Sequence, residues 1–465
     1  MTRTPDTSGA RRLVVIGADA AGMSAASQAL RVAAARGERL EVIAFESSEH
    51  TSYSQCGVPY WVAGDVGSQA ALVARTAEQH RANGIDLRLR TEVTDLDLDR
   101  REVTVRALDG GGTERVGFDE VMLATGAGEV WPDWARGLPG VHPVKTLDDG
   151  ATWRALLAAR GGQPPRRAIV VGGGFIGVEA AEAFARRGVE TLLVTRGEEP
   201  MSSSLDPAMG ALVRAGLERL GVQVVCGTEV EGVESCDGGL ATACIGGEEQ
   251  RADVVALAVG VRPRVELATA AGLRVGDHGG LVPDHTQRVA DGVWSAGDCC
   301  EVWDRVLEQY WYTPLGTHAN KAGRVAGTNI GGGSARFAGS VGTAITRAGD
   351  AEIARTGVLA DWARRHGWDV EQVSVQSTTA SGYMPEADPI TVSVLGERGT
   401  GRLLGAQIVG GRGAGKRIDV AAMALWSGLG AHDVAAADLA YAPPFSPVWD
   451  PVQIACRKLA DVLSR

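Results

Sequence analysis

At 465 residues the chain is longer than one hydrophobic core usually supports, so we expect more than one domain. Its formal charge of −11 weighs against nucleic acid as a partner, because phosphate binding requires a basic face. No apolar run of about 18 residues is present and Met1–Arg12 is polar, so we expect a soluble cytoplasmic protein with neither a membrane helix nor a signal peptide.

The cysteines are few for this length and scattered along the chain. There are seven, at positions 56, 226, 236, 244, 299, 300 and 456. An odd, dispersed set suits a reducing compartment better than a disulfide framework. The adjacent pair Cys299-Cys300 has a spacing that fits neither a zinc site nor an easy disulfide, and we expect no metal.

The first predicted unit has the order strand, glycine turn, helix, strand, acid. An apolar strand beginning near Arg12 leads into Gly17-Ala-Asp-Ala-Ala-Gly22, an Ala-rich helix to Ala35, and a strand over 40–45. This order is typical of a dinucleotide-binding βαβ unit, although Asp19 stands where a middle glycine is usual. The helix N-terminus would face a pyrophosphate, and Glu46 would accept hydrogen bonds from a ribose. The cofactor-binding positions expected here are Gly17, Ala20, Ala21, Gly22, Glu46 and Ser47.

A second unit of the same kind follows. A strand over 167–171 leads into a complete glycine fingerprint, a helix to Arg187 and a strand over 191–194. The cofactor-binding positions expected here are Gly172, Gly174, Phe175, Ile176, Gly177, Thr195, Arg196 and Gly260. Thr195 does not repel a 2′-phosphate and Arg196 could pair with it, so we favour NADPH over NADH. The alternative is that Arg196 is only a solvated surface charge.

Three further segments suggest which nucleotide each unit binds. They are 121–126, ending in Thr125-Gly126; 254–263, containing Gly260; and 292–298, ending in Gly297-Asp298. These segments resemble the corresponding turns of flavoproteins that bind two dinucleotides. The resemblance implies that Asp298 hydrogen-bonds the ribityl chain of FAD. The first unit is then the FAD site and the second the NADPH site.

Cys56 lies in Gln55-Cys-Gly-Val-Pro-Tyr60, shortly after the second predicted strand. No other cysteine follows within a hundred residues, so a local Cys-Cys pair is excluded. We interpret Cys56 as a redox nucleophile beside a flavin, the alternative being a buried structural cysteine. Because the thiolate is the reactive form, we expect nearby donors or a helix N-terminus to lower its pKa.

The character of the chain changes after Gly339. We expect strands over 340–346, 351–358, 373–380, 391–395 and 402–410, and helices over 361–367, 418–428 and 434–439. This α+β segment contains no glycine fingerprint, and it fits an interface or dimerisation domain.

Together with the segments 405–410, 416–419 and 438–446, these motifs resemble the pyridine nucleotide-disulfide oxidoreductases. Within that family the chain is similar to the single-cysteine branch of coenzyme A-disulfide reductases, NADH oxidases and peroxidases, and persulfide reductases. The resemblance implies an α/β fold with two Rossmann-like domains, similar to glutathione reductase, and a C-terminal α+β dimerisation domain. The implied division is 1–128 with 262–334 for FAD, 129–261 for NAD(P)H, and 335–465 for the homodimer interface.

The resemblance also implies roles for individual residues. Cys56 would cycle between a thiolate and a mixed disulfide or sulfenic acid, and Tyr383 and Tyr441 would assist Cys56 of the partner subunit. Phe175 would gate the nicotinamide side, and Glu179 would lie near flavin and nicotinamide. Each tyrosine could instead be a packed core residue, and Glu179 only a helix-dipole partner.

Two positions bear on the substrate. Ala20 stands where the oxidases and peroxidases carry a histidine, which favours disulfide or persulfide reduction. Gln28 and Leu30 replace arginines that often contact coenzyme A, although Arg31 is retained, and Gln55 replaces a frequent asparagine. We therefore expect an FAD-dependent NAD(P)H:disulfide oxidoreductase acting on a low-molecular-weight disulfide or persulfide. The alternatives are an NAD(P)H oxidase or peroxidase, a quinone or dye reductase that does not need the thiol, and a redox-sensing protein.

Overall fold

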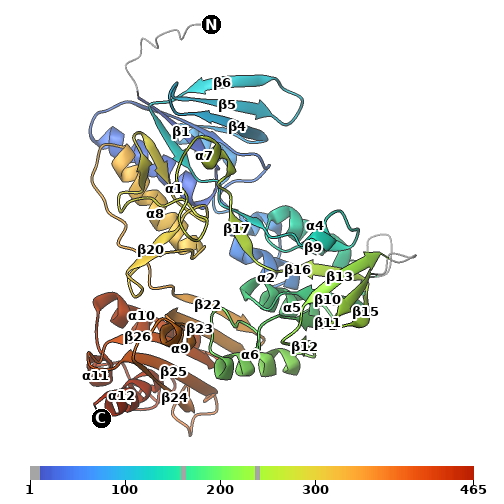
Figure 1. The fold of residues 1–465 in the computed structure, drawn as a ribbon, viewed down its shortest axis with the longest axis vertical. Helices are drawn as coiled ribbons and strands as arrows, with labels where there is room; N and C mark the ends of the chain where they lie inside the picture. Colours follow the sequence, from blue (N-terminus) through green and yellow to red (C-terminus); the bar gives the residue numbers. More distant parts are fainter. Residues whose placement is uncertain (1–10, 159–163, 236–240, 465) are drawn as a thin grey trace.

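The computed structural model describes residues 11–158, 164–235 and 241–464, which form three connected parts (Figure 1). The blue to cyan segment and the yellow to light-orange segment up to α8 together make most of the first part, the green segment makes the second, and the darker orange to red segment makes the third. The predicted α/β class, with two Rossmann-like parts and a C-terminal α+β part, is confirmed. The polar start up to residue 10 and Cys236 lie outside the described residues.

A six-stranded sheet forms the centre of the first part, in the order β18-β19-β7-β1-β2-β3. Its strands are β1 (Arg11–Ile16), β2 (Leu40–Phe45), β3 (Ile85–Arg88), β7 (Glu120–Leu123), β18 (Arg288–Ala290) and β19 (Val293–Ser295). Strand β1 runs parallel to both of its neighbours, β2 and β7, so the strand order changes direction there. Dinucleotides bind at the carboxyl ends of the strands at such a point.

Helices α1 (Ala20–Ala35) and α8 (Gly316–Ile330) pack against each other beside this sheet. A Cβ atom on Gly323 would lie 2.3 Å from the carbonyl oxygen of Ala21, and one on Gly327 would lie 2.3 Å from that of Ala25. The two glycines therefore allow the close approach that holds α1 in place. The other elements of this part are α2 (Val58–Ala63), α3 (Ala77–Ala82), α7 (Glu266–Ala270), β4 (Thr91–Asp97), β5 (Glu102–Ala107), β6 (Thr113–Gly117), β20 (Val302–Asp304) and β21 (Gln309–Trp311).

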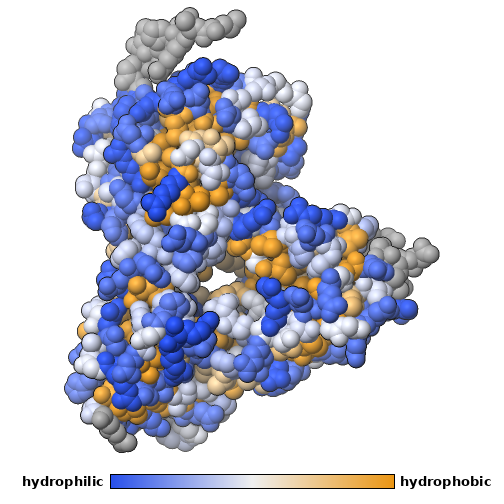
Figure 2. All heavy atoms as spheres, viewed as in Figure 1, coloured by the Kyte–Doolittle hydropathy of each residue, from blue (hydrophilic) through white to orange (hydrophobic). Residues whose placement is uncertain are grey.

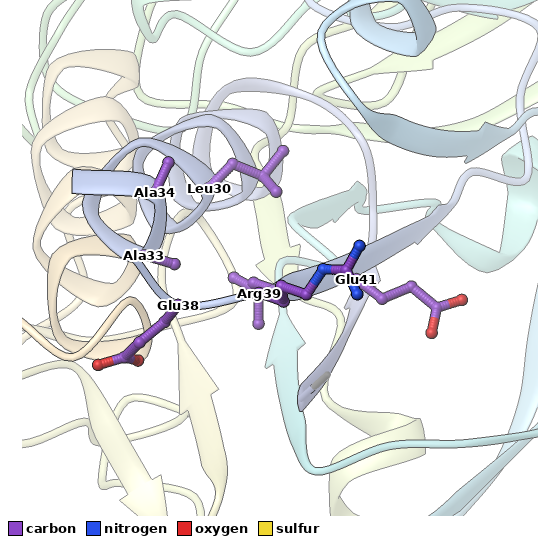
Figure 3. A pocket seen from close by; sticks show the side chains of 7 residues that line it. Leu30, Ala33, Ala34, Glu38, Arg39 and Glu41 are labelled. Carbon is purple, nitrogen blue, oxygen red and sulfur yellow. The ribbon is translucent and has the colours of Figure 1, made fainter. Parts of the chain in front are cut away.

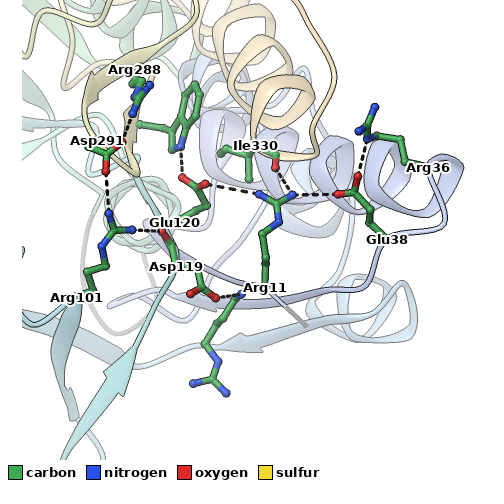
Figure 4. A network of polar contacts seen from close by, with 11 residues as sticks. Arg11, Arg36, Glu38, Arg101, Asp119, Glu120, Arg288, Asp291 and Ile330 are labelled. Atoms are coloured by element: carbon green, nitrogen blue, oxygen red, sulfur yellow. Dashed lines mark hydrogen bonds and ion pairs between the residues drawn. The ribbon is translucent and has the colours of Figure 1, made fainter. Parts of the chain in front are cut away.

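Polar contacts join the opposite ends of these elements, away from the glycine turn (Figure 4). Arg11 donates to the carbonyl oxygen of Ile330 at 3.0 Å and forms ion pairs with Glu38 at 3.4 Å and Glu120 at 3.6 Å. Trp294 Nε1 donates to Glu120 at 2.7 Å. Partly exposed ion pairs contribute little individually, but this group connects the start of β1 to the ends of α1 and α8.

The second part contains a parallel sheet in the order β12-β11-β10-β16-β9. Its elements are β9 (Val141–Pro143), α4 (Leu147–Leu157), β10 (Arg167–Val171), α5 (Phe175–Arg186), β11 (Glu190–Val194), α6 (Pro207–Arg219), β12 (Gln223–Val225) and β16 (Val254–Leu257), with an antiparallel layer of β13 (Val230–Ser235), β14 (Ala241–Ile245) and β15 (Glu248–Ala252). Strands β8 (Ala127–Glu129) and β17 (Val261–Pro263) pair where the chain enters and leaves this part.

Helix α2, which follows Cys56, packs into the core of the second part rather than of the first. Val58, Trp61 and Val62 belong to the same buried cluster as Trp153 and Phe184. Gly150 of α4 fits this contact because a Cβ there would lie 2.8 Å from the Trp61 ring. The cysteine segment is therefore held where the first two parts meet.

The third part is an antiparallel sheet in the order β22-β23-β26-β25-β24, with helices around it. Its elements are β22 (Ala344–Ala348), β23 (Ala351–Gly357), α9 (Ala360–Arg365), β24 (Val370–Thr378), β25 (Pro389–Glu397), β26 (Leu403–Gly410), α10 (Ile418–Ser427), α11 (Ala431–Ala436) and α12 (Pro451–Leu463). Helix α12 was not predicted from the sequence, although Asp450 caps it by accepting from the Val452 amide at 2.9 Å. Pro451 at its start is a second signal for a helix N-terminus.

The space-filling view shows an opening where the three parts meet (Figure 2). No helix in the described ranges is long and apolar enough to cross a membrane. The third part carries several exposed apolar side chains, of which Tyr383, Phe445 and Val448 are the most exposed, at 74%, 75% and 65%.

Candidate active site

The first glycine turn brings the β1–α1 connection against the end of β7. Gly17 has φ +98°, and a Cβ there would lie 2.1 Å from the carbonyl oxygen of Ala124. A Cβ on Gly22 would lie 1.9 Å from the carbonyl oxygen of Gly17. Both positions therefore require glycine, and together they leave the N-terminus of α1 open to a phosphate group.

Glu46 ends β2 beside this turn. Its Oε2 accepts from the Ala18 amide at 2.9 Å and its Oε1 from the Ser48 amide at 2.8 Å. These bonds orient the carboxylate over the glycine turn, as a ribose-binding acid would be placed. Ala20 and Ala21 form the first turn of α1, and Ser47 is exposed next to Glu46.

Two more loops lie at the same end of the sheet, after β7 and after β19. Thr125 Oγ1 donates to the carbonyl oxygen of Arg264 at 2.6 Å, and Gly126 has φ +68°. Gly297 has φ +93°, and a Cβ there would meet Ala21 at 3.0 Å. Burial raises the pKa of the Asp298 carboxyl. The predicted FAD residues thus lie on four neighbouring loops.

Asp19 connects the glycine turn to the cysteine segment. Although it is the N-cap residue of α1, its carboxylate makes no capping bond. It accepts instead from the Tyr53 amide at 3.2 Å and from Gln55 Nε2 at 3.3 Å. Burial raises the pKa of Asp19 to about 6, and the charge of Glu46 adds to this effect.

Lys145, which was not predicted as a site residue, acts electrostatically on both Asp19 and Asp298. Its Nζ donates to the carbonyl oxygen of Ala127 at 2.8 Å. Its positive charge lowers the pKa of Asp19 and of Asp298, against the larger effect of burial. Lysine is rare in this chain, and that rarity was the only signal in the sequence that could have drawn attention to Lys145.

The second glycine turn repeats the backbone geometry of the first. Gly172 has φ +110°, and an added Cβ there would lie 2.2 Å from the carbonyl oxygen of Ala258. An added Cβ on Gly177 would lie 1.8 Å from the carbonyl oxygen of Gly172. Gly174 is the N-cap residue of α5, and an added Cβ there would meet nothing within 4 Å. Phe175 and Ile176 start the helix partly buried, and Gly260 has φ +109°.

Thr195 and Arg196 end β11, the strand that corresponds to β2. Thr195 is buried, and its Oγ1 accepts from the Gly197 amide at 3.3 Å. The side chain of Arg196 is exposed, and no ion pair involves it within the described ranges. The strand therefore ends without a carboxylate and with an available guanidinium.

Cys56 lies in a short 3-10 turn, Gln55–Gly57, that continues directly into α2. Its side chain is exposed. The surrounding protein nevertheless removes enough water to raise the pKa of the thiol, and the carboxylates of Glu179 and Asp298 raise it further. The prediction of a lowered pKa was therefore wrong for this chain, because burial, with the two acids adding to it, outweighs the nearby backbone donor.

Glu179 projects from α5 toward α2, which follows Cys56, and toward β22. Its Oε1 accepts from Thr346 Oγ1 at 2.6 Å and from the Tyr60 hydroxyl at 3.4 Å. Burial raises the pKa of Glu179 to about 7 despite these two bonds. A carboxyl with such a pKa can hold or release a proton near neutral pH.

Tyr383 and Tyr441 lie in two loops of the third part. Both are exposed, and no hydrogen bond joins either to Cys56 among the residues described here. The Ser381 amide donates to the carbonyl oxygen of Pro443 at 2.8 Å, which ties the two loops together. The tyrosines are therefore displayed at the surface rather than packed in the core.

One ion pair beneath these loops fixes both of them. Arg417 Nε donates to Asp450 at 3.0 Å, and both side chains are nearly buried. The same guanidinium donates to the carbonyl oxygens of Thr379 at 2.6 Å and Phe445 at 2.5 Å. Each bond reaches one of the loops that carry Tyr383 and Tyr441.

The positions expected to bear on coenzyme A have structural contacts in α1. Gln28 is buried and donates to Thr328 of α8 at 2.9 Å. Leu30 lines a shallow pocket of about 340 Å³ between the C-terminal half of α1 and β2, which also includes Glu38, Arg39 and Glu41 (Figure 3). This pocket is remote from the glycine turn, and no predicted site residue lines it.

No group of three or more side chains suited to a metal ion occurs among the described residues.

Family models for the pyridine nucleotide-disulphide oxidoreductase and its dimerisation domain match residues 11–321 and 344–451. The chain is 33% identical to an NAD(P)H coenzyme A polysulfide/persulfide reductase of Pyrococcus horikoshii, over 97% of this chain and 98% of that protein.

Two further proteins resemble the chain over most of its length. It is 30% identical to an NADH oxidase of Methanocaldococcus jannaschii, over 97% of this chain and 99% of that protein. The solved structure of an NAD-dependent persulfide reductase from A. fulgidus shares 33% identity with a TM-score of 0.91, covering 97% of this chain and 84% of that one. The two glycine turns, the residues at the strand ends and the similarity over most of the chain all indicate the same family. The chain belongs to the pyridine nucleotide-disulphide oxidoreductase family, whose members use FAD and a nicotinamide nucleotide.

Proposed function

We propose that this chain is an FAD-dependent NAD(P)H oxidoreductase that reduces a low-molecular-weight disulfide or persulfide with Cys56. The observation that carries this proposal is the position of Cys56 between the two nucleotide-binding parts. Helix α2 packs on the second part, while the charges of Glu179 and Asp298 reach the thiol from both parts. The relative from Pyrococcus horikoshii, named as a coenzyme A polysulfide/persulfide reductase, supports this substrate class.

FAD would occupy the first part. We assign its contacts to Gly17, Ala20, Ala21, Gly22, Glu46, Ser47, Thr125, Gly126, Gly297 and Asp298. The open helix start suits a pyrophosphate and the fixed carboxylate of Glu46 suits a ribose. Lys145 would offset the negative charge of Asp19 beside the pyrophosphate. When bound, FAD would relay two electrons from the nicotinamide to sulfur.

NADPH would occupy the second part, held by Gly172, Gly174, Phe175, Ile176, Gly177, Thr195, Arg196 and Gly260. The buried Thr195 presents no charge against a 2′-phosphate, and the exposed Arg196 is free to pair with one. We therefore propose a preference for NADPH over NADH. Phe175 would gate the nicotinamide side, and Glu179 would lie next to it.

The sulfur chemistry would proceed in two steps at Cys56. Its thiolate attacks the substrate disulfide, forming a bond from Cys56 Sγ to one sulfur while the other leaves as a thiol after taking a proton. Two electrons from NAD(P)H and a second proton then cleave the mixed disulfide, which restores the thiolate and releases the second thiol. The sum is one NAD(P)H and one proton consumed for two thiols formed. With a persulfide the products are one thiol and hydrogen sulfide.

Tyr383 and Tyr441 would serve Cys56 of the partner subunit in a homodimer. The matched dimerisation domain and the exposure of Tyr383 at 74% and Tyr441 at 47% support this arrangement. A phenol could hydrogen-bond or protonate the departing thiolate. Arg417 would hold both tyrosine loops in the geometry that the partner requires.

The domain boundaries that we propose are those implied by the family resemblance. The FAD domain would comprise 1–128 and 262–334, the NAD(P)H domain 129–261, and the interface domain 335–465. The pairing of β8 with β17 supports boundaries near 128 and 262, since these strands connect the first two domains.

The decisive test compares the wild-type protein with Cys56→Ser. We expect Cys56→Ser to bind FAD normally but to lose NADPH-dependent reduction of coenzyme A disulfide and of coenzyme A persulfide by at least about 1,000-fold, since the nucleophile is absent. Mass spectrometry of the wild type, before and after NADPH, should show loss of a thiol adduct from the intact protein, and peptide mapping should place that adduct on Cys56. Cys226→Ser is the matched control, because this cysteine is also partly accessible but lies in the second part.

Other outcomes would favour the alternatives. NADPH consumption in air without added disulfide, with Cys56 recovered as sulfenic acid, would favour the oxidase activity for which the Methanocaldococcus jannaschii relative is named. Full turnover of quinones or dyes by Cys56→Ser, with no disulfide activity in the wild type, would favour a reductase that does not need the thiol. Ala20 has no side chain that could assist oxygen chemistry, which supports disulfide reduction.

A further inference from the structure

The segment that leads to Cys56 is hydrogen-bonded to the first glycine turn at every second residue. Asp19 accepts from the Tyr53 amide at 3.2 Å and from Gln55 Nε2 at 3.3 Å. The buried Thr51 adds a third contact, because its hydroxyl donates to the carbonyl oxygen of the residue before Asp19 at 2.5 Å. The last of these contacts is made by the residue that directly precedes the thiol.

The residues between these contacts are held by other elements of the first part. Ser52 Oγ bonds with Nε2 of the buried His80 at 2.8 Å. The Ser54 amide donates to the carbonyl oxygen of Leu72 at 2.9 Å. The segment is therefore held by two separate sets of contacts, and Asp19 provides the acceptor atoms for residues 53 and 55 in one of them.

The carboxylate of Asp19 has no role in starting its own helix. Asp19 is the N-cap residue of α1, but its side chain makes no capping hydrogen bond. In the second unit the N-cap residue is Gly174, in a turn with nearly the same backbone. A carboxylate is thus not required for a turn of this kind, and in the first unit it serves the two donors of the cysteine segment.

We propose that Asp19 is a positioning residue for Cys56: it connects the segment before the thiol to the first glycine turn and so holds the sulfur where it reacts. This inference rests on the proposed function in taking Cys56 as the redox thiol and the first part as the FAD site. The turn would then have two tasks, since its glycines admit the cofactor and Asp19 holds the cysteine segment against it.

Two features make this connection effective. Since the pKa of Asp19 is about 6, its carboxyl is mostly ionised at neutral pH, and both hydrogen bonds are charge-assisted. The chain between Tyr53 and Cys56 is short and ends in the 3-10 turn Gln55–Gly57, so a displacement at Asp19 is passed on to the thiol. A misplacement of about 1 Å at a reacting group can slow a reaction on the order of 100-fold.

The experiment separates the two half-reactions by stopped-flow absorbance of the flavin. The FAD-loaded protein is treated with dithiothreitol, desalted and kept anaerobic, so that Cys56 starts as a thiol. NADPH then reduces the flavin, and coenzyme A disulfide reoxidises it through Cys56. We expect Asp19→Ala to be reduced at the wild-type rate and to be reoxidised about 10- to 100-fold more slowly, because only the sulfur step depends on the position of the thiol. It should bind FAD at least as tightly as the wild type, since a negative charge beside the pyrophosphate is lost.

Hydrogen exchange provides a readout that does not depend on turnover. Because the Tyr53 amide is bonded to Asp19, peptides that cover 51–57 should exchange about tenfold faster in Asp19→Ala. Asp19→Asn should restore slow exchange and most of the reoxidation rate, since its amide oxygen still accepts from the Tyr53 amide. Ser24→Ala is the matched control on the same helix, because the Ser24 hydroxyl bonds to Asn320 of α8 at 3.0 Å.

A second variant approaches the same contact from its other end. Gln55→Ala removes one of the two bonds to Asp19, so it should slow reoxidation by a smaller factor than Asp19→Ala. Combining the two substitutions should add little to the effect of Asp19→Ala, because the bond is already lost. Gln55→Ala also keeps the inference testable if Asp19→Ala fails to fold.

Equal slowing of both half-reactions in Asp19→Ala would overturn the inference, as would wild-type exchange over 51–57 or a wild-type reoxidation rate in Gln55→Ala. Loss of FAD from a folded Asp19→Ala would also overturn it, because Asp19 would then serve the cofactor. These outcomes are distinguishable from failure of the proposed function. If Cys56→Ser retained disulfide reduction, Cys56 would not be the redox thiol, whereas the exchange data would still show whether Asp19 holds the segment.

Discussion

The two nucleotide-binding units have nearly the same backbone at their glycine turns and different side chains around them. In the first unit the Cβ atoms of Gly17 and Gly22 would lie 2.1 Å and 1.9 Å from carbonyl oxygens, and in the second those of Gly172 and Gly177 would lie 2.2 Å and 1.8 Å away. The middle position is Asp19 in one and Gly174 in the other. In the first unit the strand after the helix, β2, ends in a fixed carboxylate. In the second unit the corresponding strand, β11, ends in a threonine and an arginine.

This difference separates two tasks of a dinucleotide site. The glycines make room for a pyrophosphate in either unit, whatever the nucleotide. The strand-end side chains discriminate between nucleotides, and the middle position determines what else the turn contacts. In the first unit Asp19 contacts the segment that carries Cys56, whereas Gly174 makes no side-chain contact at all.

The largest expected effects come from filling the glycine turns. Gly22→Ala should purify without FAD, because the new Cβ collides with the carbonyl oxygen of Gly17. Gly177→Ala should retain FAD but lose NADPH-dependent reduction by more than about 100-fold, because the same collision occurs in the second unit. Absorbance of the bound flavin and stopped-flow reduction measure the two effects. Gly67→Ala is the control, since its Cβ would meet nothing within 4 Å. Equal loss of FAD in both turn variants would contradict the separate assignment.

Removing the carboxylate at the end of β2 should have the next largest effect. Glu46→Gln should weaken FAD binding about 10- to 100-fold, because charge-assisted hydrogen bonds contribute roughly 1.5 to 3 kcal/mol. The quench of FAD fluorescence on titration of the apoprotein measures the affinity. Glu49→Gln, at an exposed position three residues later, should bind FAD like the wild type. Wild-type affinity in Glu46→Gln would remove Glu46 from the FAD site.

Asp19 predicts a pH dependence of stability that Gly174 cannot have. Since the pKa of Asp19 is raised from 3.8 to about 6 in the folded chain, the native state holds a proton that the unfolded chain releases, and stability falls as pH rises from about 4 to 6. Asp19→Asn should match the wild type at pH 4 and exceed it by about 2 kcal/mol at pH 7. Chemical unfolding of the FAD-saturated protein measures this, with Asp133→Asn as an exposed control. A constant difference at both pH values would rule out Asp19 as the cause.

The smallest effect is expected at the end of β11. Arg196→Ala should raise KM for NADPH about five- to tenfold and leave kcat and the NADH kinetics unchanged, since an exposed guanidinium–phosphate pair contributes about 1 to 1.4 kcal/mol. Steady-state kinetics with both nucleotides measure it. Arg251→Ala, another exposed arginine of the same part, should change neither KM. A parallel rise of KM for NADH would mean that Arg196 does not discriminate.

Local patterns in the sequence predicted much of the fold. Both glycine turns, the strands beside them and Glu46 follow from residues that are adjacent in sequence, and the structure contains these elements within a few residues of the predicted bounds. The same kind of signal was present and missed at Asp450-Pro451, which starts α12.

The contacts around Cys56 could not be predicted in this way. Asp19 reaches Gln55 from another loop, and Thr346 reaches Glu179 from another part of the chain. No periodicity or motif records such pairs, because they depend on how the three parts dock. The expected low pKa of Cys56 was wrong for the same reason: burial by the docked parts raises this pKa most, and Glu179 and Asp298, which raise it further, are far away in sequence.

The pairing of β8 with β17 has a consequence for how the chain folds as it is synthesised. Strand β19 and helix α8, which complete the first sheet and hold α1, follow the entire second part in the sequence. A nascent chain therefore presents β7 as an open sheet edge until the second part has emerged from the ribosome. Once that part has folded, Ala127 and Pro263 lie opposite each other, and the returning chain is delivered next to the strand it must join. The inserted second part thus holds the two ends of the first part close together, which lowers the entropic cost of completing its sheet.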